Sequence, residues 1–488
     1  MKILLIEPPF ERFIGQRCEW YPIGLVSIAT LLDKHGHVAR VYNAEHDNSL
    51  DYINTEVYLK NYYKYKEGLD NGDNTVWREI YQKVKSFDPD IVGVSVKSIK
   101  IPSALRIAKI CKGINKEIKV VAGGLHPTMR PNSFLNSNDI DIVIRGEGEE
   151  TFLELAEVLN KGNISFNQIK GISYKEFDGK IVNTLDRALI KELDILSVPK
   201  RELILGYDGY TADQLGWIMT SRGCAYDCTF CNAKAMWTRK VRFLSLSIVM
   251  DELDYLRKNF KITNITFMDD SFTVNKKRVM EFCKMLIEGN KKITWSCLTR
   301  ADLIDEEVIK KMKEAGCTKV DIGIESGSER VQKIINKGID LDDLRRISVV
   351  LRKHGIFWTG FFMMGFPTET KEEILETLAF MKEIRPSWAY LSVFSPYPGT
   401  HLYELAKKKG MFSEDSEYVF SHQNPDNCFS ENIEPEEFKD LTQYMFKELN
   451  KFNNAASNLL KRALSRNYYR NPQLLLQDAR KVMTWLKK

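Results

Sequence analysis

The first third of the chain alternates short apolar runs with segments of helical periodicity. The apolar runs are rich in Val and Ile and end in small or polar residues, as buried parallel strands do; they cover 2–7, 37–45, 90–96, 119–124 and 141–146. Helical periodicity covers 22–36, which Pro22 opens and Gly36 closes, and then 101–115 and 148–160. This alternation predicts an α/β fold over residues 1–165, with a doubly wound, Rossmann-like sheet and a helical insertion at 46–88.

A second alternating series follows a connector at 166–212. Its predicted strands are 216–221, 265–270, 293–300, 320–326, 358–367 and 389–396, with helical patterns between them. Six units over roughly 180 residues fit a partial (β/α)6 TIM-like barrel at 213–405 better than a complete barrel, which needs about 250 residues. Residues 406–488 are amphipathic and basic, and they predict a C-terminal helical cap rather than a membrane-surface helix.

Candidate binding residues follow the predicted strands. Sheets and barrels of this kind bind ligands at the carboxyl ends of their strands. In the first series these ends hold Pro9, Ser95, Gly123, Gly124 and Glu147, and in the second the ends include Asp269-Asp270, Arg300 and Glu325-Ser326. Glu147 begins a run of acids that also fits a helix N-terminus, the favoured interpretation. The Asp269-Asp270 pair fits substrate positioning and a solvated strand end equally well.

Composition narrows the possible functions. The 488 residues are 43% hydrophobic and 28% charged, with 71 Lys and Arg against 66 Asp and Glu. The basic excess is spread along the chain, so we expect no nucleic-acid surface. No apolar run reaches about 18 residues, and the N-terminus lacks a signal-peptide pattern, so we expect no membrane span and a cytoplasmic protein.

Three of the nine cysteines form a cluster, Cys224, Cys228 and Cys231. Structural zinc prefers four protein ligands, and no histidine lies nearby. Three thiolates on a four-iron cluster leave one iron open to a small molecule. Phe230 would shield such a cluster from water, and Gly223 allows a tight turn into the loop.

This cysteine spacing resembles the signature of radical S-adenosylmethionine enzymes. Further similar segments are ITFMDDSFTVN (265–275), WSCLTRAD (295–302), VDIGIESGSERV (320–331), MMGFPTET (363–370) and SPYPGT (395–400). The resemblance implies a 4Fe–4S cluster on the three cysteines, with S-adenosylmethionine bound to its open iron. It further implies that Glu325, Ser326 and the neighbourhood of Arg300 hold the ribose and carboxylate of that cosubstrate. Tyr226 either reaches the adenine or cobalamin, or packs the loop.

The first domain resembles the cobalamin-binding domain that precedes the barrel in one subgroup of these enzymes. The similar segments are EPPF, PIGLVSIATLLDKHGH, PDIVGVSV, VVAGGLHPT and VIRGEGEETFLEL. Gly123 and Gly124 would allow close approach of a bulky planar ligand or its nucleotide tail. The DxHxxG motif that supplies a histidine to cobalt is absent. His126 is then either a cobalt ligand or, the favoured interpretation, a hydrogen-bonded loop histidine.

The resemblance implies a cobalamin-dependent radical C-methyltransferase acting on an unactivated carbon of a small molecule. The alternative within this class is a radical oxidoreductase, cyclase or isomerase without net methyl transfer. From other classes, an iron–sulfur electron carrier or sensor and a zinc-stabilised binding module stay open. An external flavodoxin- or ferredoxin-like electron donor, anaerobic operation and a monomeric or weakly dimeric state complete the expectations.

Overall fold

The computed structural model describes residues 1–18, 20–52, 55–162, 165–412, 424, 426–455 and 458, with the backbone alone for 51–52 and 55–60. These residues form two compact units, Met1–Asp270 with Ser395–Phe429, and Ser271–Phe394 with Ser430 onward. Residues 459–488, which carry much of the predicted C-terminal helical pattern, lie outside the described residues.

A seven-stranded sheet organises the start of the first unit. Its order is β3 (Val38–Asn43), β1 (Lys2–Glu7), β5 (Ile91–Ser95), β6 (Lys119–Gly123), β7 (Ile142–Ile144), β8 (Ile172–Lys175) and β9 (Ile181–Asn183). The first five strands are parallel and the last two antiparallel. Parallel strands buried on both faces need continuous apolar runs, and these segments have them. The doubly wound prediction is confirmed.

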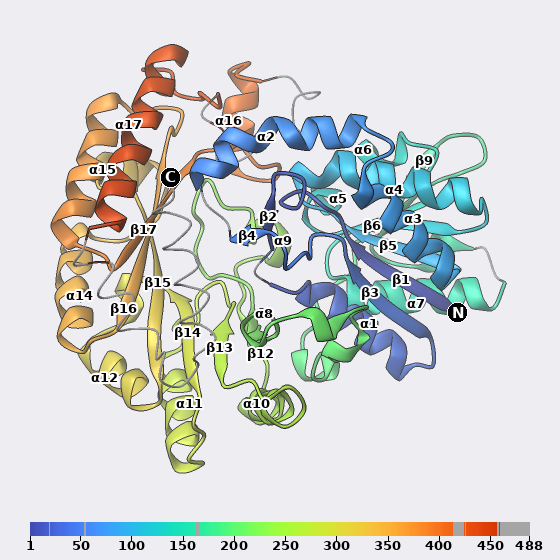
Figure 1. Cartoon of the computed structure of the whole chain (residues 1–488), viewed down its shortest axis with the longest axis horizontal. Coiled ribbons are helices and arrows are strands. Elements are labelled where there is room, and N and C mark those ends of the chain that lie inside the picture. The colour runs from blue at the N-terminus through green and yellow to red at the C-terminus, as the bar shows by residue number, and fades with distance from the viewer. Residues whose placement is uncertain are drawn as a thin grey trace. The chain divides into compact units, whose positions relative to one another are not determined.

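Helices cover both faces of this sheet (Figure 1). Helix α1 (Ile23–Lys34) packs against α7 (Gly148–Asn160), and α3 (Thr75–Phe87) packs against α4 (Ile101–Ile114). The insertion at 46–88 contains α2 (Thr55–Asp70) and α3, so its helical prediction is confirmed. The Asn74 side chain caps α3 by accepting a hydrogen bond from the amide of Val76. Packing on both faces fixes the strand ends, where the pocket described below lies.

The rest of the first unit carries the cysteine segment. Strand β10 (Trp217–Ile218) pairs in parallel with β13 (Asn264–Phe267), and β11 (Ser221–Arg222) pairs antiparallel with β12 (Arg242–Phe243). The remaining helices of this part are α5 (Leu125–Met129), α6 (Asn132–Leu135), α8 (Ala212–Leu215), α9 (Ala233–Trp237), α10 (Leu246–Phe260) and α16 (His401–Lys408). The predicted strand 216–221 is therefore split, because Thr220 and Ser221 hydrogen-bond to the Asp269 carboxylate.

Four parallel strands order the second unit: β14 (Thr294–Thr299), β15 (Cys317–Glu325), β16 (Phe357–Met364) and β17 (Trp388–Val393). The helices among the described residues of this unit are α11 (Lys276–Glu288), α12 (Glu306–Glu314), α13 (Glu329–Ile334), α14 (Leu341–Lys353), α15 (Lys371–Ile384) and α17 (Pro435–Asn453). Figure 1 shows α12, α14 and α15 along one side of these strands. Asp305, Asp340 and Thr370 cap helices with their side chains. The predicted alternation of strand and helix is confirmed.

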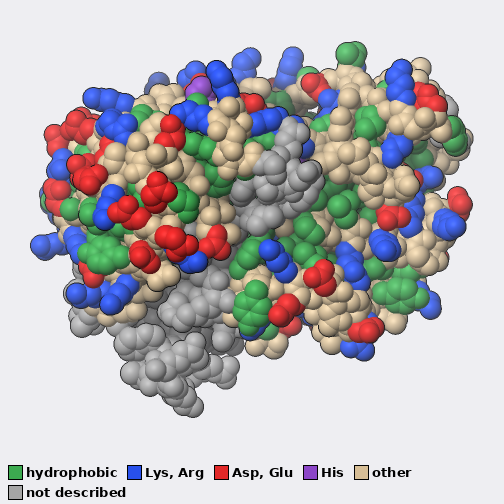
Figure 2. Space-filling view, turned by 90° about the horizontal axis from the view of Figure 1, so that it is seen from above, with side chains coloured by type: hydrophobic (Ala, Val, Ile, Leu, Met, Phe, Trp, Pro, Cys, Tyr) green, Lys and Arg blue, Asp and Glu red, His purple; other side chains and the backbone are tan. Residues whose placement is uncertain are grey.

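Two further observations concern membrane crossing and surface charge. Among the described residues, no helix combines the length and apolar character that a bilayer crossing requires. On the face shown in Figure 2, acidic and basic side chains of the described residues are interspersed.

Candidate functional site

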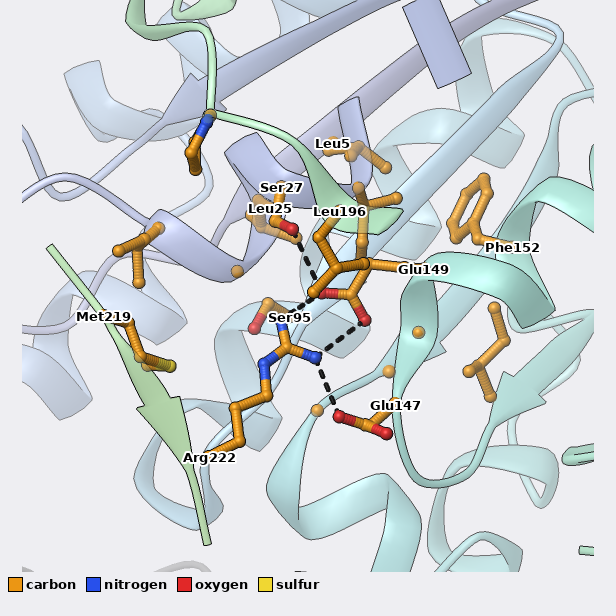
Figure 3. Close-up of a pocket in the computed structure, with 18 of the residues that line it drawn as sticks. Leu5, Leu25, Ser27, Ser95, Glu147, Glu149, Phe152, Leu196, Met219 and Arg222 are labelled. Atoms are coloured by element: carbon orange, nitrogen blue, oxygen red, sulfur yellow. Dashed lines mark hydrogen bonds and ion pairs between the residues drawn. The ribbon is translucent and has the colours of Figure 1, made fainter. Parts of the chain in front are cut away.

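A cavity lies at the carboxyl ends of strands β5, β6 and β7 in the first unit (Figure 3). Ser95, Gly123, Gly124 and Glu147, four of the residues predicted from strand ends, line it. The wall is mostly apolar, with Leu5, Leu25, Phe152, Leu196 and Met219 among its residues. Its volume of about 220 Å³ is below that of pockets for whole drug-sized ligands, so a cobalamin molecule would place only a part, such as its nucleotide tail, inside.

Several glycines line this cavity. Gly146 has φ +78°, and a Cβ there would meet no atom within 4 Å. Gly124 has φ +102°, and its Cβ would lie 3.0 Å from the amide nitrogen of Val96. Gly123 has only ordinary contacts at its Cβ position, the nearest being Ile144 at 3.8 Å. Backbone without side chains at the strand ends lets a ligand approach closely, which fits a nucleotide tail.

A buried ion-pair network forms one side of the cavity (Figure 3). The Arg222 guanidinium donates to Glu147 Oε1 at 2.8 Å and to both carboxylate oxygens of Glu149. Burial alone would raise the pKa of Glu149, but the charge and hydrogen bonds of Arg222 outweigh it and hold this pKa below its usual value. Glu147 thus lies at the cavity wall, where Arg222 binds its carboxylate. Glu149 lies in the first turn of α7, as expected for an acidic residue at a helix N-terminus.

The cysteine loop follows Arg222 directly. Cys224 and Cys228 are half-buried and Cys231 is exposed. Desolvation of the sulfur, with smaller contributions from Cys228, Asp270 and Cys224, raises the pKa of the Cys231 thiol to about 11. Among the described residues, no three Cys, His, Asp or Glu side chains converge on a single-ion site. A cubane binds each thiolate through a different iron, and three thiols on one loop fit it chemically.

Tyr226 and Phe230 are half-buried within the same loop. Neither belongs to the wall of the cavity. Their predicted contacts with cosubstrate, cobalamin or cluster stay predictions.

Pro9 and His126 lie away from the cavity wall. The Pro9 carbonyl accepts a hydrogen bond from Ser103 Oγ at 2.7 Å. His126 is 2% exposed, and its Nδ1 lies 2.8 Å from Ser98 Oγ. Burial, with a smaller contribution from Arg130, lowers the pKa of His126 to about 4. The structure therefore supports the hydrogen-bonded interpretation of this histidine.

Asp269 is neither a solvated nor an open strand-end acid. Its side chain is 1% exposed and accepts hydrogen bonds from the Thr220 amide at 3.1 Å and from the Thr220 hydroxyl at 2.9 Å. The carboxylate thus fixes the segment that leads into the cysteine loop.

The second unit brings Glu325, Arg300 and Lys337 together. Lys337 Nζ donates to Glu325 Oε1 at 2.8 Å, while the Lys337 carbonyl accepts from Arg300 Nη2 at 2.8 Å. Glu325 has φ +71°, an unfavourable conformation for a residue with a side chain. A Cβ at Gly323 would lie 2.7 Å from Glu325 Oε1 and 2.8 Å from Lys337 Nζ, so this glycine makes room for the ion pair. Backbone strain at such a residue supports a binding role.

Ser326 lies beside this group but its hydroxyl faces protein atoms. Its Oγ accepts from the Ser328 amide at 3.1 Å and lies 3.1 Å from Thr377 Oγ1. Its predicted contact with the cosubstrate stays a prediction.

Sequence reasoning missed Arg222, Arg242 and Lys337. The position of Arg222 directly before Gly223-Cys224 was an available signal, because residues at the start of a ligand loop determine its direction. No local pattern marks Arg242 or Lys337, since the partner of Arg242 is distant in the chain and helix α13 separates Lys337 from Glu325.

Two family models match the chain. Residues 17–156 match the B12 binding domain, and residues 218–381 match the radical SAM superfamily. The cavity residues Ser95, Gly123 and Gly124 lie within the first match and the three cysteines within the second.

Two known proteins and one solved structure are similar to this chain over most of its length. An uncharacterized methyltransferase of Pyrococcus horikoshii is 36% identical over 413 residues, which are 83% of this chain and 83% of that protein. The anaerobic magnesium-protoporphyrin IX monomethyl ester cyclase of Rubrivivax gelatinosus is 29% identical over 71% of this chain and 64% of its own length. The solved structure of the radical S-adenosylmethionine methyltransferase TsrM of Kitasatospora setae, with cobalamin and a 4Fe–4S cluster bound, has a TM-score of 0.66 and 19% identity, covering 83% of this chain and 78% of that one.

Proposed function

This chain belongs to the radical S-adenosylmethionine enzymes that carry a B12-binding domain, and we propose that it methylates an unactivated carbon of a small molecule or natural-product intermediate. Its cofactors are a 4Fe–4S cluster, S-adenosylmethionine and cobalamin. The observation that carries the proposal is that one compact unit contains both the glycine-lined cavity and the cysteine loop, and that Arg222 lines the cavity and directly precedes the loop.

The cofactors divide the chemistry between them. When bound, the cluster supplies the electron that splits S-adenosylmethionine to a 5′-deoxyadenosyl radical, and cobalamin supplies the methyl group. The protein supplies binding, orientation and exclusion of water. Cys224, Cys228 and Cys231 would hold the cluster, leaving one iron for the cosubstrate.

The remaining candidate residues orient the two organic cofactors. Ser95, Gly123 and Gly124 would hold the cobalamin tail at the strand ends, since they line the cavity. Glu325, positioned by Lys337, would accept hydrogen bonds from the hydroxyls of the cosubstrate ribose, because an ionised carboxylate is acceptor-only. The apolar wall around Leu5, Phe152 and Met219 keeps water away from the cofactor pocket.

Product analysis under strict anaerobiosis tests the proposal. Reconstituted protein given a substrate, S-adenosylmethionine, cobalamin and a reductant should form S-adenosylhomocysteine together with 5′-deoxyadenosine. The first product reports methyl transfer to cobalamin, and the second reports radical formation. Turnover that gives 5′-deoxyadenosine alone would contradict methylation.

A cysteine substitution tests the cluster ligands. Cys228→Ala should lose iron–sulfur absorbance and both products while keeping corrin binding. Cys428→Ala is the matched control, because Cys428 is also half-buried but lies outside the loop. Full iron content in Cys228→Ala would contradict this ligand set.

The similarity to the cyclase of Rubrivivax gelatinosus favours a second candidate function. A radical cyclase or oxidoreductase would use the same radical without net methyl transfer. Detection of S-adenosylhomocysteine distinguishes the two functions, because only the methyltransferase forms it.

The proposal also includes an electron donor, an oligomeric state and a cellular location. Cleavage of the sulfonium consumes one electron, so we infer an external flavodoxin- or ferredoxin-like donor. We also infer a monomer or weak dimer in the cytoplasm. Analytical ultracentrifugation and reduction of the cluster by purified flavodoxin test these inferences.

A further inference from the structure

The three cysteines lie on a hairpin whose two ends are opposite each other. Strands β11 and β12 pair antiparallel, with Arg222 directly across from Arg242, and residues 223–241 form the loop between them. Gly223 begins this loop with φ +103°, and a Cβ there would lie 2.2 Å from the Lys240 carbonyl oxygen. The ends of the loop are therefore held together tightly.

Both arginines at the base of the hairpin bind the same carboxylate. Glu147 Oε1 accepts from Arg222 Nη1 at 2.8 Å, and Glu147 Oε2 accepts from Arg242 Nη1 at 2.8 Å. Two arginines in register across a ribbon repel each other unless an anion lies between them. Glu147 provides this anion, and its Oε2 also accepts from the amide of Ile190 at 2.7 Å.

Glu149 completes the charge balance. It binds the fork of Arg222 with both oxygens and accepts from Ser27 Oγ at 3.1 Å. The side chains of the four ions are only 3–11% exposed, so two carboxylates and two guanidinium groups neutralise one another away from water. Partly desolvated pairs of this kind are rigid, because loss of one partner leaves a buried charge unpaired.

A residue of the loop itself contacts the same group. The Trp237 ring lies 5.7 Å from the Arg222 guanidinium and 6.0 Å from that of Arg242. The base of the hairpin is thus fixed from the sheet side by acids and from the loop side by an aromatic ring.

The residues that fix the hairpin are also wall residues of the cavity. Glu147, Glu149, Arg222 and Trp237 all line it. A ligand that fills the cavity therefore touches the side chains that determine the direction of the cysteine loop. A shift of these side chains on ligand binding would move the cysteine loop with them, and a linkage of this kind changes the affinities of both ligands by the same factor.

We propose that Glu147 and Glu149 are positioning residues for the iron–sulfur cluster. Through Arg222 and Arg242, these two acids couple the binding of cobalamin to the binding of S-adenosylmethionine. This inference rests on the proposed function, because it requires all three cofactors. It assigns to Glu147 a positioning role through the arginines, in addition to its place in the cavity wall. The acids act through the arginines, so their effect is on affinity and on the electronic state of the cluster.

The test compares Glu147→Gln with Glu150→Gln in cluster-loaded protein. Glu150 is the matched control, since it belongs to the same acidic run but makes none of the contacts above. The Kd of S-adenosylmethionine is measured by equilibrium dialysis with and without saturating cobalamin. The paramagnetic resonance spectrum of the reduced cluster is recorded for each protein with and without cobalamin.

In the wild type and in Glu150→Gln, cobalamin should change the Kd of S-adenosylmethionine by a factor of about 5 or more. In Glu147→Gln the factor should fall below about 2, and the spectrum should no longer respond to cobalamin. If Glu147→Gln does not fold, Glu149→Gln, which leaves Glu147 with both arginines, is judged by the same ratio.

Two outcomes would overturn the inference: no coupling in a wild type that binds all three cofactors, or undiminished coupling in the folded acid variant. A wild type that retains no corrin, or whose cluster spectrum ignores S-adenosylmethionine, would instead contradict the proposed function.

Discussion

Lys337 holds the carboxylate of Glu325 at 2.8 Å, on a backbone whose φ at Glu325 is +71°. Because the two side chains are only 11% and 9% exposed, each depends on the other for its charge balance. The ion pair orients a carboxylate that we propose for cosubstrate binding.

Loss of this lysine should weaken cosubstrate binding. Lys337→Met should raise the Kd of S-adenosylmethionine about 10- to 100-fold, since a hydrogen bond to a charged group contributes about 1.5–3 kcal/mol. Equilibrium dialysis with cluster-loaded protein measures this. Lys333→Met, on the exposed side of α13, should leave the Kd unchanged, and an unchanged Kd in folded Lys337→Met would contradict the role of the pair.

An alanine at Gly223 should disturb the cysteine loop. The positive φ costs about 1–3 kcal/mol for a residue with a side chain, and the close Lys240 carbonyl forces the backbone apart. We expect lower iron content after reconstitution and unchanged corrin binding. Gly179→Ala, with φ +86° and no atom within 4 Å of its Cβ, provides the backbone control. Equal iron content in both variants would contradict the prediction.

A larger side chain at Gly123 should close the cavity. Its Cβ has only ordinary contacts, so Gly123→Leu should change the free energy of unfolding by no more than about 1 kcal/mol. Corrin absorbance after desalting should be lost, while iron content stays normal. Gly113→Leu, an exposed position on α4, serves as the control, and corrin retention in folded Gly123→Leu would place cobalamin elsewhere.

The stability of the second unit should fall as the pH rises towards 8. Burial raises the pKa of Glu369 to about 8, against the smaller opposing effect of hydrogen bonds from Gly365 and Phe366. Between pH 4.5 and this value the folded state keeps a proton that the unfolded state has lost. This group therefore lowers the free energy of unfolding by up to about 1.4 kcal/mol per pH unit across that window.

Glu369→Gln should remove this contribution. Urea unfolding across the window should show a smaller loss of stability in the variant than in the wild type, whereas exposed Glu376→Gln should follow the wild type. Parallel pH dependence in all three proteins would show that Glu369 is ionised in the folded state.

Local patterns predicted most of the fold and part of the candidate site. Apolar runs located the strands, so Ser95 and Gly123 were expected at strand ends and lie there. Periodicity could not divide 216–221 between β10 and β11, because the division depends on hydrogen bonds that Thr220 and Ser221 donate to Asp269, about 50 residues later.

The ion pairs escaped prediction for a similar reason. Arg222 and Arg242 are 75 and 95 residues from Glu147 in sequence, and a charge carries no sign of its distant partner. The acids of α7 also fit the favourable interaction of negative charge with a helix N-terminus. This local explanation predicts no distant partner for them.

The hairpin that carries the cysteines is closed by ribbon pairing and by the acid–arginine contacts, and none of these contacts uses a sulfur atom. Closing the base of this hairpin therefore requires no bond to iron. The start and end of the cysteine segment are set by backbone pairing and side-chain charge, which are encoded in the sequence alone.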